Sequence, residues 1–164
     1  MKVLEEQNKV LTQSKEDYLE AILIINSKKK WVRVKDLAKY LGVKMSSVVT
    51  TIHSLTKRGL VTHEKYGYIE LTQRGAEIAR EIYARHQSLH KFLHDFLGLS
   101  DSIAWNDACQ IEHTLNPKTM KRILKFLEFI EICPEGEPTW LSNFYSFLKT
   151  GKLPESCFRR NRSK

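Results

Sequence analysis

No proline precedes Pro117, and this absence constrains the fold more than any other feature of the chain. Proline breaks helices in their interior, so a long stretch without it leaves room for consecutive helices. The few glycines, among them Gly42, Gly59 and Gly98, follow runs with apolar residues at helical spacing, where helices commonly end. A mainly α-helical protein with tight turns is therefore predicted.

A winged helix-turn-helix is predicted in the N-terminal half. Helices are expected over 35–40 and 45–55, with a turn at Gly42 between them. Two short alternating runs, 60–64 and 69–72, flank a glycine-containing turn and predict a β-hairpin. Helix, turn, helix and hairpin follow one another in the order of a DNA-binding winged helix.

Further helices predict an all-helical second half. They are expected over 73–97, 102–115 and 117–132, with a first helix after Ser14 and a short aromatic helix over 140–148. Their apolar stripes are typical of a core or a dimer interface. We predict three parts: a DNA-binding domain over 1–75, a metal-binding and dimerisation domain over 76–132, and a C-terminal extension over 133–164.

The charge balance favours a polyanionic partner. The 164 residues carry a formal net charge of +8, with a pI near 9.4, although a soluble protein can also be basic without binding nucleic acid. Apolar runs are too short to span a membrane, and the first residues lack a signal-peptide core, so a cytoplasmic location is expected. Three cysteines at unrelated spacings indicate reduced thiols rather than a disulfide framework.

The predicted second helix of the helix-turn-helix carries small hydroxyl side chains on its outward face. Such a helix can approach the major groove closely, while surrounding lysines and arginines contact phosphates. Winged helices also serve purely in protein contacts, and that alternative stays open. The predicted DNA-contacting residues are Lys35, Lys44, Ser46, Ser47, Thr50, Thr51, Ser54, Lys57, Arg58, Lys65 and Tyr66.

Metal-competent side chains cluster at Cys109, Glu112 and His113. The spacing i, i+3, i+4 places a thiolate, a carboxylate and an imidazole on one helix face, where they can chelate a transition metal. If these groups were buried without a partner they would be costly, and an exposed thiol would be prone to oxidation. The sequence therefore predicts a metal site on this helix.

Two pairs on other predicted helices could add ligands. Asp17 and Glu20 lie three residues apart, and His86 and His90 lie four apart. Each pair has an ordinary explanation, since acids early in a helix favour its dipole and spaced histidines often cover a solvated face. His94, which continues the histidine row, is assigned to that ordinary case.

Four segments in order carry a resemblance to a known family. SKEDYLEAI at 14–22, the winged helix, RHQSLHKFL at 85–93 and NDACQIEHTL at 106–115 resemble the diphtheria toxin repressor and manganese transport regulator family. The resemblance covers about residues 12–132. It implies a homodimeric, metal-activated transcriptional regulator, with a repressor as the expected form and a palindromic operator as its double-stranded DNA partner.

The resemblance also assigns ligand roles. Asp17, Cys109, Glu112 and His113 match the principal ligands, while Glu20 and His86 match ligands of the manganese-type branch. His90 falls where the iron-type branch has an ancillary glutamate. Trp105 falls where that branch has an ancillary histidine, and Cys109 is iron-type whereas Asp17 is manganese-type.

The expected cofactor is a divalent transition metal. Carboxylates suit Mn²⁺, whereas thiolate and imidazole favour later ions, so Zn²⁺, Co²⁺ or Ni²⁺ should bind in vitro at least as tightly as Fe²⁺ or Mn²⁺. Availability in the cell makes an iron or manganese sensor the expectation. Two alternatives stay open: a metal-independent winged-helix regulator that binds a small molecule, and an enzyme with Cys109 as nucleophile and His113 as base. No oxyanion arrangement supports the enzyme.

Overall fold

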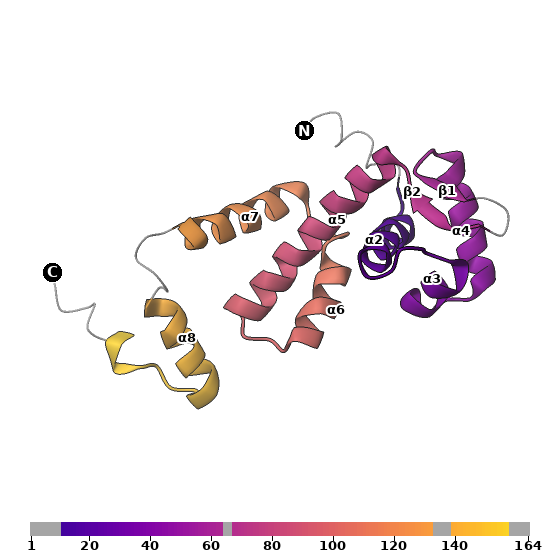
Figure 1. The fold of residues 1–164 in the computed structure, drawn as a ribbon. Helices are drawn as coiled ribbons and strands as arrows, with labels where there is room; N and C mark the ends of the chain where they lie inside the picture. Colours follow the sequence, from indigo (N-terminus) through magenta and orange to yellow (C-terminus); the bar gives the residue numbers. More distant parts are fainter. Residues whose placement is uncertain (1–10, 64–66, 133–138, 158–164) are drawn as a thin grey trace. The chain divides into compact units, whose positions relative to one another are not determined.

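The structure, a computed structural model, describes residues 11–63, 67–132 and 139–157 (Figure 1). The chain forms two compact units, Met1–Arg85 and His86–Lys164. The predicted three-part division, with boundaries after residues 75 and 132, stays a prediction. The elements are α2 (Gln13–Lys28), α3 (Val34–Leu41), α4 (Met45–Lys57), β1 (Val61–His63), β2 (Ile69–Leu71), α5 (Gln73–Lys91), the π-helix η1 (Phe92–Phe96), α6 (Asp101–Ile111), α7 (Pro117–Ile132), α8 (Thr139–Thr150) and the 3₁₀ turn η2 (Glu155–Cys157).

The first unit is a winged helix-turn-helix, as predicted. Helices α2, α3 and α4 pack around one apolar core that includes the fully buried side chains of Leu19, Ile22, Leu37 and Ile52. Gly42 adopts a left-handed conformation, with φ of 66°, between α3 and α4. That conformation is open to glycine at little cost and sharpens the turn.

Two local predictions in this unit need correction. Helix α2 begins one residue before Ser14, because the carbonyl of Thr12 accepts the amides of Lys15 and Glu16 and makes Thr12 the N-cap. The run 31–34 was expected to form a short strand, but only Val32 pairs, in an isolated bridge with Ile69. The chain enters α3 at Val34, which leaves no length for a strand.

The wing is a two-stranded antiparallel hairpin in which Thr62 pairs with Glu70. Its second strand leads directly into α5 through Thr72, whose hydroxyl donates to the Gly59 carbonyl at 2.8 Å and accepts the Gly75 amide at 3.0 Å. A Cβ at Gly75 would lie 1.9 Å from the Leu60 carbonyl oxygen. This glycine therefore permits the close approach of α5 to the hairpin.

The second unit is all-helical within its described residues. One apolar cluster joins the end of α5 to α6 and α7 through Leu89, Ala104, Ala108 and Met120, and a second cluster joins η1, α7 and α8. The predicted helix over 73–97 changes to a π-helix at Phe92, and the predicted helix over 102–115 ends as an α-helix at Ile111. No helix among the described residues has the length and apolarity to cross a bilayer.

Candidate metal centre and DNA interface

Helix α6 carries two parallel stripes of different chemistry. Ala104 and Ala108 are fully buried and pack against the end of α5, and their small side chains allow a close approach of the two helices. Trp105, Cys109 and Glu112 follow one position later at i, i+4 and i+7. The second stripe is therefore held along the edge of the contact between α5 and α6.

His86 from α5 meets this stripe. One ligand atom each from His86, Cys109 and Glu112 can be chosen so that all three lie within 4.8 Å of one another. The His86 ring packs against Trp105 with ring centroids 4.1 Å apart, and its side chain is 1% exposed. Sequence spacing brought Cys109 and Glu112 together, and the fold adds His86 from another helix.

Glu112 is the most constrained member of the cluster. Its side chain is fully buried, and its Oε1 lies 3.2 Å from Nε2 of His113 and 3.7 Å from Nδ1 of His86. Burial raises the pKa of Glu112, but the contacts with His113 and His86 outweigh it, so the pKa lies below its ordinary value. The buried carboxylate is therefore ionised at neutral pH.

The donor set fits a divalent transition metal. Neither oxygen of Glu112 accepts a hydrogen bond of good geometry from any described residue, and a buried charge in that state is costly without a cation. A thiol sulfur, an imidazole nitrogen and a carboxylate oxygen together suit Fe²⁺, Co²⁺ and Zn²⁺, and the carboxylate also suits Mn²⁺. His113, whose side chain is 3% exposed, lies beside them.

His113 joins the cluster in a way that the sequence did not predict. We expected Cys109, Glu112 and His113 on one continuous helix face, but α6 ends at Ile111 and Glu112 is its C-cap. His113 follows in a turn in which the amides of Thr114 and Leu115 both bond to the Ile111 carbonyl. The turn keeps the His113 ring against Glu112.

Two further predicted ligands belong to the first unit. Asp17 is half-buried and Glu20 is 5% exposed, both on α2. Glu16 on the same helix is also buried, and its carboxylate lies 3.5 Å from the Arg85 guanidinium. The sequence analysis did not single out Glu16 or Arg85. The ligand roles of Asp17 and Glu20 remain predictions.

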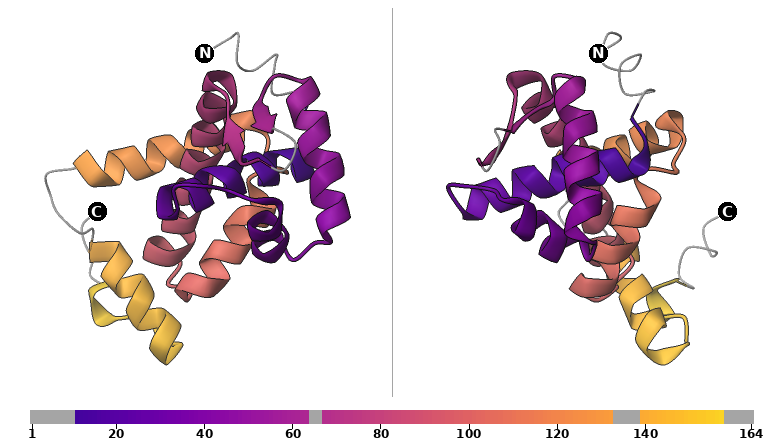
Figure 2. Two further views of the ribbon diagram at one scale, coloured as in Figure 1. Left: turned by 45° about the vertical axis from the view of Figure 1, so that its right-hand side comes forward. Right: turned by 90° about the vertical axis from the view of Figure 1, so that its right-hand side faces the viewer.

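The predicted DNA interface lies on α3, α4 and the basic residues around them. Figures 1 and 2 show α4 on the outer side of the first unit, where Val48, Ile52 and Leu55 face the core. Lys65 and Tyr66 lie outside the described residues. Of the other predicted contacts, Thr51 and Ser54 are half-buried, and the exposed ones are Lys35, Lys44, Ser46, Ser47, Thr50, Lys57 and Arg58.

Several features of this surface were missed. Met45 and Val49 are 59% and 50% exposed on α4, and an exposed apolar side chain there can contact a thymine methyl group. Thr50 donates its hydroxyl to the Ser46 carbonyl, so that donor is already used. At the wing, Trp31 stacks on Tyr68 with ring centroids 4.5 Å apart.

Known proteins with this arrangement are metal regulators. Residues 10–69 match the family model described as iron dependent repressor, N-terminal DNA binding domain, and residues 72–141 match its metal binding and dimerisation domain. A helix-turn-helix-type transcriptional regulator of Methanocaldococcus jannaschii is 38% identical over 72% of this chain and 95% of its own length. The regulator MntR of Lysinibacillus sphaericus is 33% identical over 76% of this chain and 88% of its own.

Solved structures agree. A manganese-dependent transcriptional repressor in complex with manganese is 32% identical with a TM-score of 0.65, and the match covers 70% of this chain and 53% of that one. IdeR of T. acidophilum is 25% identical with a TM-score of 0.63, over 75% and 57%. The chain thus spans just over half the length of these two structures.

The family consists of transcriptional regulators, so the enzyme and the metal-independent alternative are not favoured. Both predicted halves, the winged helix and the helical metal-binding part, are matched in order. The chain belongs to the iron-dependent repressor family, the diphtheria toxin repressor and manganese transport regulator family of metal-dependent transcriptional regulators.

Proposed function

We propose that this protein is a cytoplasmic, homodimeric repressor that binds a palindromic operator when Fe²⁺ or Mn²⁺ occupies the cluster of His86, Cys109, Glu112 and His113. The observation that carries the proposal is the buried, ionised Glu112 beside a thiol and two imidazoles. A buried charge in this setting is costly in the apo protein. A divalent ion would neutralise it.

The family resemblance adds Asp17 and Glu20, from the first unit, to the ligand set. Ligands contributed by both units would couple metal binding to the DNA-binding unit. In a dimer, two α4 helices must reach half-sites about 34 Å apart. Coupling of about 1–3 kcal/mol would then separate active from inactive protein.

The metal is chosen by availability as much as by the ligands. Sulfur and imidazole donors bind Zn²⁺, Co²⁺ and Ni²⁺ at least as tightly in vitro as Fe²⁺ or Mn²⁺. Iron or manganese is proposed as the ion in the cell, because the family models and a manganese-bound relative carry those names.

The test is retention of genomic DNA fragments by the apo protein under anaerobic conditions. Mn²⁺ and Fe²⁺ are added separately, with chelator as the reference. Retention of specific fragments with metal alone supports the proposal and identifies the ion and the operator. Equal retention with chelator contradicts it.

Variants locate the response. Glu112→Ala and His113→Ala should lose metal-stimulated retention, whereas Glu128→Ala, an exposed acid on α7, should respond like the parent protein. A normal metal response of the Glu112 variant would overturn the site assignment.

A further inference from the structure

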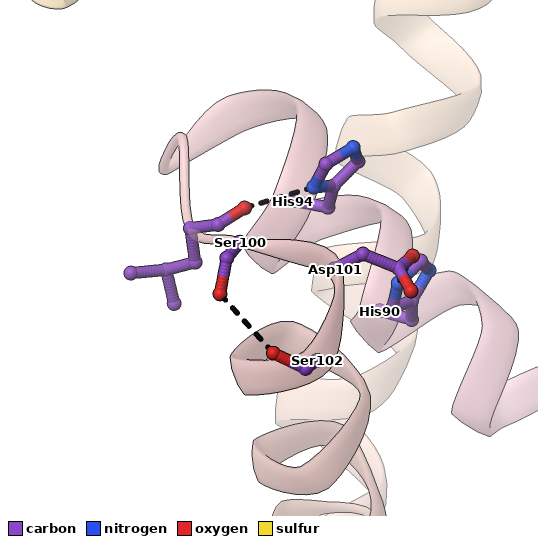
Figure 3. A network of polar contacts seen from close by, with 6 residues as sticks. His90, His94, Ser100, Asp101 and Ser102 are labelled. Carbon is purple, nitrogen blue, oxygen red and sulfur yellow. Dashed lines mark hydrogen bonds and ion pairs between the residues drawn. The ribbon is translucent and has the colours of Figure 1, made fainter.

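A second group of metal-competent side chains lies where α5 meets the start of α6. His90 on α5 places its Nε2 3.0 Å from Oδ1 of Asp101, the first residue of α6, and His94 follows His90 by one turn (Figure 3). The two imidazole rings are nearly parallel, 12° apart, with centroids separated by 5.6 Å. Two imidazoles and a carboxylate therefore lie together within the second unit.

The backbone prepares His94 as a ligand. His94 lies in the π-helix Phe92–Phe96, and such widened turns are often found at functional sites because they redirect a side chain. Its Nδ1 lies 2.8 Å from the Leu99 carbonyl oxygen (Figure 3). Because a carbonyl only accepts, Nδ1 carries the proton, and Nε2 of the neutral ring keeps its lone pair for a metal.

An ion pair alone explains this arrangement poorly. The Asp101 side chain is 82% exposed, and a pair so open to water contributes little to stability. An ion pair between His90 and Asp101 also gives no reason for a second imidazole stacked on the first. A shared cation uses all three groups, and two histidines at i, i+4 can reach one ion from a single helix.

The group is distinct from the first cluster. Trp105 packs on His86 with centroids 4.1 Å apart and meets the His90 ring edge-on at 5.6 Å. The indole thus stands beside both histidines and offers an apolar wall instead of a ligand. His90 takes Asp101 as its neighbour, at the solvent-exposed end of α6.

We propose that His90, His94 and Asp101 form a second, solvent-accessible divalent-metal site with nitrogen and oxygen donors. Its donors suit Zn²⁺, Co²⁺ and Ni²⁺, with water completing the coordination. Bound metal ties α5 to the first turn of α6. The site does not depend on the proposed function, because it shares no ligand with the buried cluster of His86, Cys109, Glu112 and His113.

Cobalt distinguishes the two sites in one titration. Co²⁺ at a thiolate produces a near-ultraviolet sulfur-to-metal charge-transfer band, whereas Co²⁺ held by nitrogen and oxygen shows only weak visible bands. We expect one equivalent with the charge-transfer band, from Cys109, and a weaker second equivalent without it. Equilibrium dialysis with Zn²⁺ should likewise give two ions per chain.

His94→Gln and Asp101→Asn should each weaken the second equivalent by at least about tenfold, since even an outer-shell partner changes metal affinity by that much. Both residues are exposed, so the variants should fold, and an unchanged charge-transfer band checks that they do. Asp95→Asn, an exposed acid in the same π-helix, is the matched control and should keep both equivalents.

Each outcome decides between the alternatives. Loss of the second equivalent in both variants, with the first retained, supports the site. A second equivalent of unchanged affinity in either variant overturns it, as does a parent protein that binds only one ion. A missing charge-transfer band with an intact second equivalent contradicts the first cluster and leaves this site standing.

Discussion

Replacing Glu112 by leucine should separate the stability of the apo protein from its response to metal. The Glu112 side chain is fully buried and ionised, and neither oxygen accepts a well-formed hydrogen bond from the described residues. Exchanging buried charges for apolar groups of similar volume is often neutral or stabilises a protein by about 1–4 kcal/mol. In chelator, the variant should therefore be at least as stable as the parent.

Metal should reverse the order. A ligand that binds the native state at about one hundred times its Kd stabilises it by about 2.7 kcal/mol. The parent protein should gain this much with Mn²⁺ or Co²⁺. The Glu112 variant should gain far less, because the charged ligand between the two imidazoles is missing. The two stability differences thus have opposite signs.

Urea unfolding followed by far-ultraviolet circular dichroism, with chelator and with saturating metal, measures both differences. Glu128→Leu, an exposed position on α7, is the control and should leave the metal-induced gain unchanged. The reasoning is refuted if the Glu112 variant loses several kcal/mol in chelator. That loss would mean that the carboxylate is held for the fold rather than for a cation.

Three further outcomes test the first unit. Lys57→Ala should weaken operator binding for all sequences and reduce the salt dependence by about one ion, measured by anisotropy across salt concentrations. Thr50→Val should change operator affinity by only about 0.5 kcal/mol, because the hydroxyl already donates to Ser46; a loss of about 1–3 kcal/mol would show base reading. The Lys29 ammonium, with smaller contributions around it, lowers the pKa of Asp36, so the interaction stabilises the fold above about pH 4 and is lost as pH falls through the folded pKa. Asp36→Asn should accordingly be less stable than the parent at about pH 7 and equal to it at very low pH in urea unfolding; a constant difference would contradict this.

The winged helix was predictable because its signals are local. Apolar residues at helical spacing, Gly42 in the turn, and two alternating runs fix the element order without knowledge of the tertiary fold. The ends of elements were less predictable. Thr12 rather than Ser14 caps α2, since the choice depends on which carbonyl meets the first free amides.

The metal cluster was predictable only in part. Cys109 and Glu112 lie on one turn of α6, and their spacing suffices to bring them together. The contact of His86 with them depends on the packing of α5 against α6, which no local pattern encodes. The row of histidines at 86, 90 and 94 was visible, but the π-helix that redirects His94 was not.

The one-residue offset between the two stripes of α6 explains how packing and chemistry coexist on one helix. Ala104 and Ala108 have no exposed surface, so they set the separation of α5 and α6. Successive side chains on a helix are rotated by about 100°, so Cys109, directly after Ala108, lies at the margin of the contact, where it is half-buried. A larger residue at Ala108 would push α5 away and move His86 from its partners. The alanines therefore position the metal ligands although neither contacts a metal.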